Sequence, residues 1–163
     1  MPEISETREM AASAQEVWRM LVDFQGYARW NPYVRVEGTA EGGRRVRYSF
    51  RRGAGRRPIE TDAELLVSED QTVLRFSMGG LGLVHVTEWF AIDRGGTGVR
   101  VTHGVRFSGF LSLFAWPIAR RMDRRYLWQP LDLLARHLQA HGPRRRAAKP
   151  SQKGKRNAPA KRR

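Results

Sequence analysis

Two ionisable side chains stand out because each lies in an alternating pattern that is otherwise apolar. His103 has a valine two residues away on either side, and Glu88 is flanked at the same spacing by a valine and a phenylalanine. If both side chains face the interior, a carboxylate and an imidazole meet in apolar surroundings. Burial and pairing shift the pKa values of such groups, so the pair is a candidate acid and base. The alternative is an internal polar pair with no catalytic role.

The alternation around Glu88 predicts which way its side chain points. With Ile92 opposite Val99 in the last hairpin, Glu88 lies opposite His103. A shift of the register by one residue would instead send Glu88 to solvent. The inward-facing set that contains Glu88 is apolar at four of five positions, and the opposite set at three of five. The first set is Val84, Val86, Glu88, Phe90 and Ile92, and the second is Leu83, His85, Thr87, Trp89 and Ala91.

The pair must be positioned by a sheet. Apolar and polar residues alternate over 45–51, 59–68, 74–78 and 99–108, with glycine-rich or acidic turns between these segments. A period of two is expected when an antiparallel sheet has one dry and one wet face. On the wet face, arginines of the first segment lie across from acids of the second, which favours their pairing.

The dry face needs a cover, and the segment 112–141 is long enough to provide one. Leucines recur there at helical spacing, with arginines around them. Pro117 and Pro130 interrupt the pattern, and Pro130 is expected to kink the helix. Trp128 groups with the arginines on the polar side, where it either stacks locally or marks a contact with a partner.

The stretch 13–34 reads SAQEVWRMLVDFQGYARWNPYV. Ser13 and Glu16 form a capping box for a short helix, and Asn31-Pro32 ends the helical region before a strand at 33–36. The order Val17-Trp18, Asp23-Phe24, Tyr27, Trp30-Asn31-Pro32 resembles the START/Bet v 1-like superfamily of SRPBCC domains, which includes polyketide cyclase/dehydrase and lipid transport proteins.

The resemblance implies an α+β helix-grip fold: a curved antiparallel sheet of about seven strands wrapped on a long C-terminal helix, with two short helices after the first strand. It also implies an internal cavity between helix and sheet. Aromatic and methionine side chains suit the wall of such a cavity. The candidate ligand-binding residues are Trp30, Tyr48, Phe76, Met78, His103, Phe107, Trp116 and Tyr126.

The charge of the chain is concentrated at one end. The formal net charge is +14, and residues 143–163 hold ten of the 30 lysines and arginines with no acid, leaving +4 for residues 1–142. Because this segment has no large apolar side chain, we expect a domain over 1–142 and a disordered basic tail over 143–163. The tail is expected to be a solvated extension, or to contact nucleic acid or anionic membrane non-specifically.

Several other classes of site are not indicated. The chain has no cysteine, and its four histidines lack metal-ligand spacing apart from the pair His137 and His141. The lack of cysteine and of a secretory signal favours a cytoplasmic protein, and no transmembrane segment is expected. No motif for a metal or other cofactor is present, so none is expected. The predicted function is binding, with or without transport, of a hydrophobic small molecule or lipid. The alternatives are a polyketide cyclase/dehydratase-type enzyme, and an interaction module that uses the tail.

Overall fold

The computed structural model describes residues 2–51, 55–67, 70–80, 83–96, 98–110, 112 and 124–141. These residues form a seven-stranded antiparallel sheet in the order β1-β7-β6-β5-β4-β3-β2. The strands are β1 (Glu3–Met10), β2 (Val34–Glu37), β3 (Arg45–Phe50), β4 (Ile59–Val67), β5 (Val73–Gly80), β6 (Val84–Arg94) and β7 (Val99–Ser108). The alternating segments of the sequence are therefore strands, as predicted.

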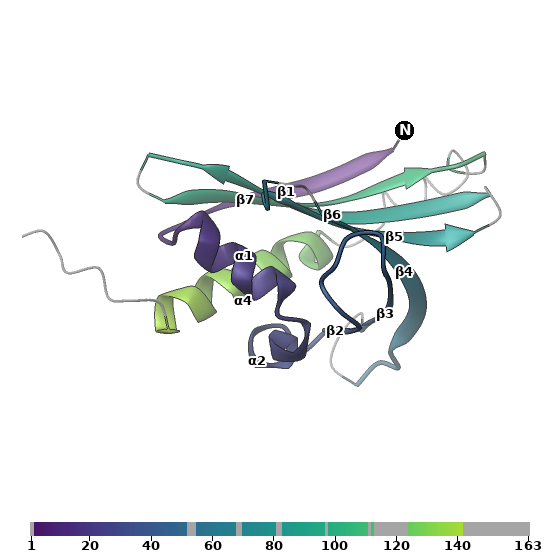
Figure 1. Cartoon of the computed structure of the whole chain (residues 1–163), viewed down its shortest axis with the longest axis horizontal. Helices are drawn as coiled ribbons and strands as arrows, with labels where there is room; N and C mark the ends of the chain where they lie inside the picture. Colours follow the sequence, from purple (N-terminus) through teal and green to yellow (C-terminus); the bar gives the residue numbers. More distant parts are fainter. Residues whose placement is uncertain are drawn as a thin grey trace, which may run out of the picture.

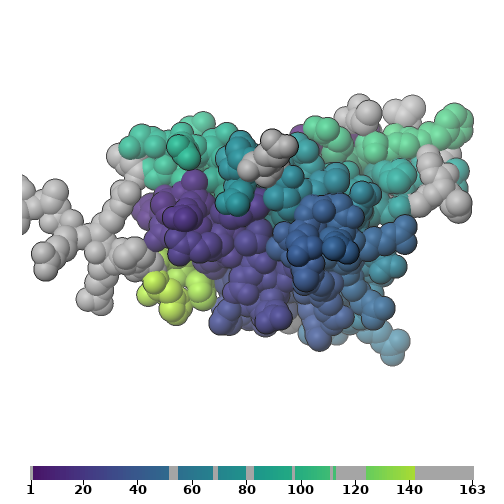
Figure 2. Space-filling model, viewed as in Figure 1, coloured from purple at the N-terminus to yellow at the C-terminus, as the bar shows by residue number. Residues whose placement is uncertain are grey.

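The helices lie between β1 and β2 and at the end of the described chain. They are α1 (Ala14–Val22), the short 3-10 helix η1 (Phe24–Gly26), α2 (Tyr27–Trp30) and α4 (Arg125–His141). Figure 1 shows the sheet above α4, with the strands β3 and β4 bending down beside the helices. Figure 2 shows that α1 and α2 cover this side of the molecule, so that only one end of α4 is visible. The arrangement is the predicted helix-grip fold.

The first helix begins where the sequence predicts. The Ser13 side chain accepts from the Glu16 N–H at 3.2 Å, and the Glu16 carboxylate accepts from the Ser13 N–H at 2.7 Å. This capping box satisfies two donors at the helix N-terminus. Val17, Trp18 and Leu21 are buried, so α1 presents its apolar stripe to the core.

The helix α4 closes the inner face of the sheet. Leu127, Leu131 and Leu134 are almost fully buried beneath the sheet. The helix includes Pro130 and continues to His141, and the kink expected at this residue stays a prediction. Burial of leucines before and after the proline stabilises the helix on both sides of the missing hydrogen bond. Residues 113–123, which include Pro117, lie outside the described residues. No helix in the described part of the chain is long and apolar enough to cross a membrane.

Candidate functional site

Glu88 and His103 meet on the inner face of the sheet. Glu88 is 2% exposed and His103 is fully buried. The His103 Nε2 atom lies 2.8 Å from the Glu88 Oε1 atom. The inward orientation and the contact between the two side chains are therefore as the alternation predicted.

The predicted register of this hairpin was wrong by two residues. Glu88 is opposite Val105, and His103 is opposite Phe90. The connection spans Gly95–Gly98, with the Gly95 N–H bonded to the Gly98 carbonyl at 2.9 Å. Each β6 residue therefore pairs with a β7 residue two positions further along the chain than predicted. A slide of two preserves which side chains face inward, and diagonal neighbours in a sheet remain within reach of long side chains. His103 instead stacks on Phe90, with ring centroids 4.3 Å apart.

The second nitrogen of His103 connects the sheet to α4. Its Nδ1 atom lies 2.9 Å from the backbone carbonyl oxygen of Leu127. A carbonyl only accepts hydrogen bonds, so Nδ1 carries a proton. The bond between Nε2 and Glu88 then contains a second proton, held either by the imidazole or by the carboxyl group. The pair thus stores one transferable proton in a dry environment.

Two tyrosine hydroxyls complete the network at the other carboxylate oxygen. Tyr48 donates to Glu88 Oε2 at 2.8 Å, and Tyr126 donates to the same atom at 3.0 Å. Both bonds satisfy the carboxyl oxygen Oε2 of Glu88, which is buried away from solvent. Burial and then the nearby Glu88 carboxylate raise the pKa of Tyr48 well above its ordinary value of 10.0, so Tyr48 remains a donor.

The sequence predicted Tyr48 and Tyr126 as walls of a cavity and missed their bonds to Glu88. It also missed the Leu127 carbonyl. The alternation places Tyr48 on the same face as Glu88, but the distance between them depends on the curvature of three intervening strand pairings. Pro130 gave no signal for the bond to the Leu127 carbonyl, because a proline removes the donor of the carbonyl four residues before it, which is that of Tyr126.

The predicted wall residues fall into two apolar clusters on the inner face. Trp30, Tyr48, Phe76 and Met78 belong to the main core. Phe107 packs with Val105 and Leu127 in a second cluster, and the half-buried Tyr126 lies against it. The hydrogen bonds of His103 and Glu88 join side chains of both clusters. Trp116 lies outside the described residues, so its assignment stays a prediction.

One end of the inner face is incompletely covered. Val86 alternates with Glu88, and Phe50 alternates with Tyr48, so both face inward, yet both are only half buried. Tyr126 is half buried as well, and its ring meets that of Phe50 at 5.8 Å. Apolar and aromatic surface therefore remains accessible beside the Glu88 network.

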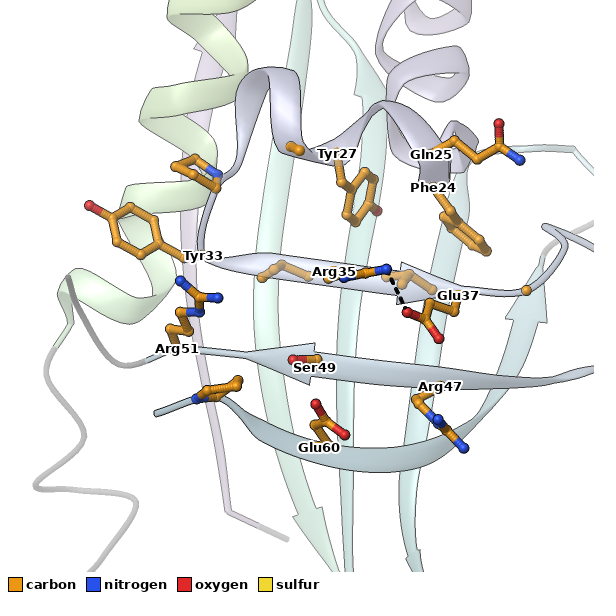
Figure 3. A pocket seen from close by; sticks show the side chains of 16 residues that line it. Phe24, Gln25, Tyr27, Tyr33, Arg35, Glu37, Arg47, Ser49, Arg51 and Glu60 are labelled. Carbon is orange, nitrogen blue, oxygen red and sulfur yellow. Dashed lines mark ion pairs between the residues drawn. The ribbon is translucent and has the colours of Figure 1, made fainter. Parts of the chain in front are cut away.

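A separate cleft of about 650 Å³ lies at the edge of the sheet, around β2. Figure 3 shows Arg35 and Glu37 on β2 joined by an ion pair, with an Nη2–Oε1 distance of 2.9 Å. Arg47 lies on the neighbouring strand β3, and Arg51 follows directly after that strand. None of the predicted wall residues that the structure describes lines this cleft. Its charged lining differs from the apolar cavity that the sequence predicted.

The histidines outside the network do not form a metal centre. His137 and His141 stack with ring centroids 4.2 Å apart, and His141 Nδ1 lies 3.1 Å from the His137 carbonyl. Burial, followed by the neighbouring His141, lowers the pKa of His137. Among the described residues, no group of three histidine or acidic side chains could hold a metal ion. Trp128 is 46% exposed, in agreement with its predicted place on the polar side of α4.

Comparison with known proteins identifies the family. The profile of the family described as polyketide cyclase/dehydrase and lipid transport matches residues 1–139. The chain belongs to this family. Its sequence has no significant match among curated proteins.

Solved structures share the fold at low sequence identity. TTHA0849 from Thermus thermophilus superposes with a TM-score of 0.65 and 17% identity, over 87% of this chain and 100% of that one. Norcoclaurine synthase from Thalictrum flavum, in complex with dopamine and hydroxybenzaldehyde, superposes with a TM-score of 0.66 and 13% identity, over 87% of this chain and 88% of that one. The di-domain ARO/CYC protein BexL of the BE-7585A biosynthetic pathway gives 0.68 and 14% identity, over 85% of this chain but only 47% of BexL.

Proposed function

We propose that the protein binds a hydrophobic small molecule or lipid between the inner face of the sheet and α4. The observation that carries the proposal is the apolar surface of Phe50, Val86 and Tyr126, which is incompletely buried beside the Glu88 network. Membership of a family that includes lipid transport supports it. Apolar pockets with few, well-placed polar groups are typical of small-molecule sites.

In this proposal the two inner-face clusters supply the walls, and the network supplies the polar points. The polar side chains of the network are Glu88, His103, Tyr48 and Tyr126. Their burial costs desolvation free energy, which their mutual hydrogen bonds offset. Walls made of Tyr48, Phe76, Met78 and Phe107 accommodate an apolar or ring-shaped ligand. The basic tail and a cytoplasmic location remain predictions from the sequence.

Binding of the neutral dye Nile red tests the proposal. A neutral dye is needed because the chain carries a net charge of +14 and attracts anionic dyes to its surface. We expect one dye per domain, with enhanced fluorescence. Met78 lies opposite Val86 in the register, so Met78→Trp should fill the space and abolish binding. Leu66→Trp is the matched control, because Leu66 is 40% exposed on the outer face. Undiminished binding by a folded Met78→Trp variant would contradict the wall assignment.

A second function, that of a polyketide cyclase/dehydratase-type enzyme, is favoured by the proton held between Glu88 and His103. The half-buried Tyr126 connects this proton to the accessible surface through its bond to Glu88. Ring closure of a poly-β-ketone chain needs a base to remove a carbon-bound proton and an acid to release water. The test is mass spectrometry of a poly-β-ketone thioester incubated with wild type and with Glu88→Gln. Products lighter by one water, formed by wild type alone, support catalysis, and equal yields exclude it.

A further inference from the structure

The donors of the Glu88 network are fully committed. His103 uses Nδ1 on the Leu127 carbonyl and Nε2 on Glu88, while both tyrosine hydroxyls donate to Glu88 Oε2. A ligand carrying a carbonyl or ether oxygen therefore finds no spare donor in this network. Any acceptor on the ligand must be bonded by a side chain elsewhere on the wall.

Trp30 is a donor that lacks an acceptor. Within the described part of the chain, its indole Nε1 atom is buried and has no hydrogen-bond partner. The residue is only 5% exposed, so solvent does not reach it. An unsatisfied buried donor has lost its hydration without gaining a protein partner, and native proteins keep few of them. Among the described side chains the indole of Trp89 is a second such group, but it lies on the opposite face of the sheet, over Gly104.

Trp30 occupies the corner where three elements meet. The helix α2 packs against both β2 and α4. In the register of β2 with β3, Val34 lies opposite Phe50, and the Phe50 ring contacts Tyr126 on α4. Phe50, one of the incompletely buried residues of the proposed site, thus lies across from the strand that directly follows α2. The Trp30 ring is fixed there by an edge contact with Tyr27, with centroids 5.0 Å apart.

We infer that Trp30 Nε1 is the donor that recognises an acceptor oxygen of the ligand. This inference rests on the proposed function and narrows its ligand class to apolar molecules that carry a carbonyl, ester or ether oxygen. Pairing the orphaned donor with a ligand acceptor would remove its cost in the complex. A pure hydrocarbon would leave the donor unpaired and bind less tightly.

Two probes of the same shape test this inference. In 2-acetylnaphthalene a carbonyl stands where 2-isopropenylnaphthalene has a methylene group. We expect wild type to prefer the ketone by roughly fivefold to tenfold, the value of one net hydrogen bond. Trp30→Phe should bind both probes equally. Trp128→Phe, which alters an exposed tryptophan of α4, should keep the preference.

The outcomes separate the inference from the proposed function. If wild type binds neither probe, both are overturned. If it binds both equally, or if Trp30→Phe keeps the preference, the binding site stands and the role of Trp30 is excluded. If the Trp30→Phe variant fails to fold, nuclear magnetic resonance of the wild type tests the inference without it. The Trp30 indole proton, assigned through its contact with Tyr27, should move downfield with the ketone and not with the alkene. An equal shift with both probes would overturn the inference.

Discussion

The proton between Glu88 and His103 belongs to the pair and not to either residue. The Leu127 carbonyl fixes one proton on Nδ1, and one further proton lies between Nε2 and Glu88, so the buried pair carries no net charge. Removing either partner leaves the other buried without its hydrogen-bond partner. The loss then exceeds what the intact pair contributes to stability.

A double-mutant cycle measures this coupling. Glu88→Gln and His103→Ala should each lower the free energy of unfolding by about 3–5 kcal/mol. The double variant should lose clearly less than the two single losses together, because neither unpaired group remains. Urea denaturation followed by circular dichroism provides the values. Strictly additive losses would show that the two side chains do not act as a pair.

We predict that the protein loses stability at high pH because Tyr27 is buried. Burial, then the charges of Glu88 and Asp23, raises the pKa of Tyr27 far above its ordinary value of 10.0. Above that pH the unfolded chain releases the proton and the folded chain retains it, so the free energy of unfolding falls as the pH rises. One such tyrosine contributes a slope of about 1.4 kcal/mol per pH unit. Tyr27→Phe should reduce the slope above pH 10 by that amount and leave the slope near pH 7 unchanged. An equally steep loss in the variant would contradict the assignment.

At the scale of elements, alternation predicts the faces of the strands more securely than their register. Reversing the face of β6 would expose the apolar residues that alternate with Glu88 and would bury His85 and Thr87 beside Trp89. Apolar burial would therefore be lost. The register depends on whether Gly95-Gly96 forms the whole turn or only part of a four-residue connection, and both options preserve the faces. The hydrogen bonds to Glu88 depend on sheet curvature and on the position of α4, which no local pattern encodes.

The packing of β6 on β7 requires a glycine at 104. Trp89 lies opposite Gly104 on the outer face, and a Cβ atom there would lie 2.5 Å from the indole ring. Gly104→Ala should therefore destabilise the protein by about 1–3 kcal/mol. The loss should largely disappear in a Trp89→Val background. Gly96→Ala, where nothing lies within 4 Å, is the control for the loss of a glycine. Thermal denaturation distinguishes these variants, and an equal loss in both backgrounds would contradict the clash.

At the scale of the whole molecule, the family match and the charge distribution divide the chain at nearly the same place. The match ends at residue 139, and the run of basic residues begins at 144. The helix α4 ends between them, at His141. The motif at 13–34 was sufficient to predict the fold because its residues build the corner of α1, α2 and β2. The motif does not predict the ligand, because the side chains that would contact a ligand lie mainly on other elements of the inner face.

We predict that residues 1–142 fold without the tail. The last described core side chains, Leu134 and Ala135, are buried under the sheet, whereas residues 143–163 contain no large apolar side chain that could dock there. A chain ending at Gly142 should therefore melt within about 2 °C of the full chain. A chain ending at Leu133 is the control, since it loses the buried end of α4 and should not fold cooperatively. Differential scanning calorimetry compares the three proteins. A decrease of more than a few degrees on removal of the tail alone would mean that the basic segment contributes to the folded domain.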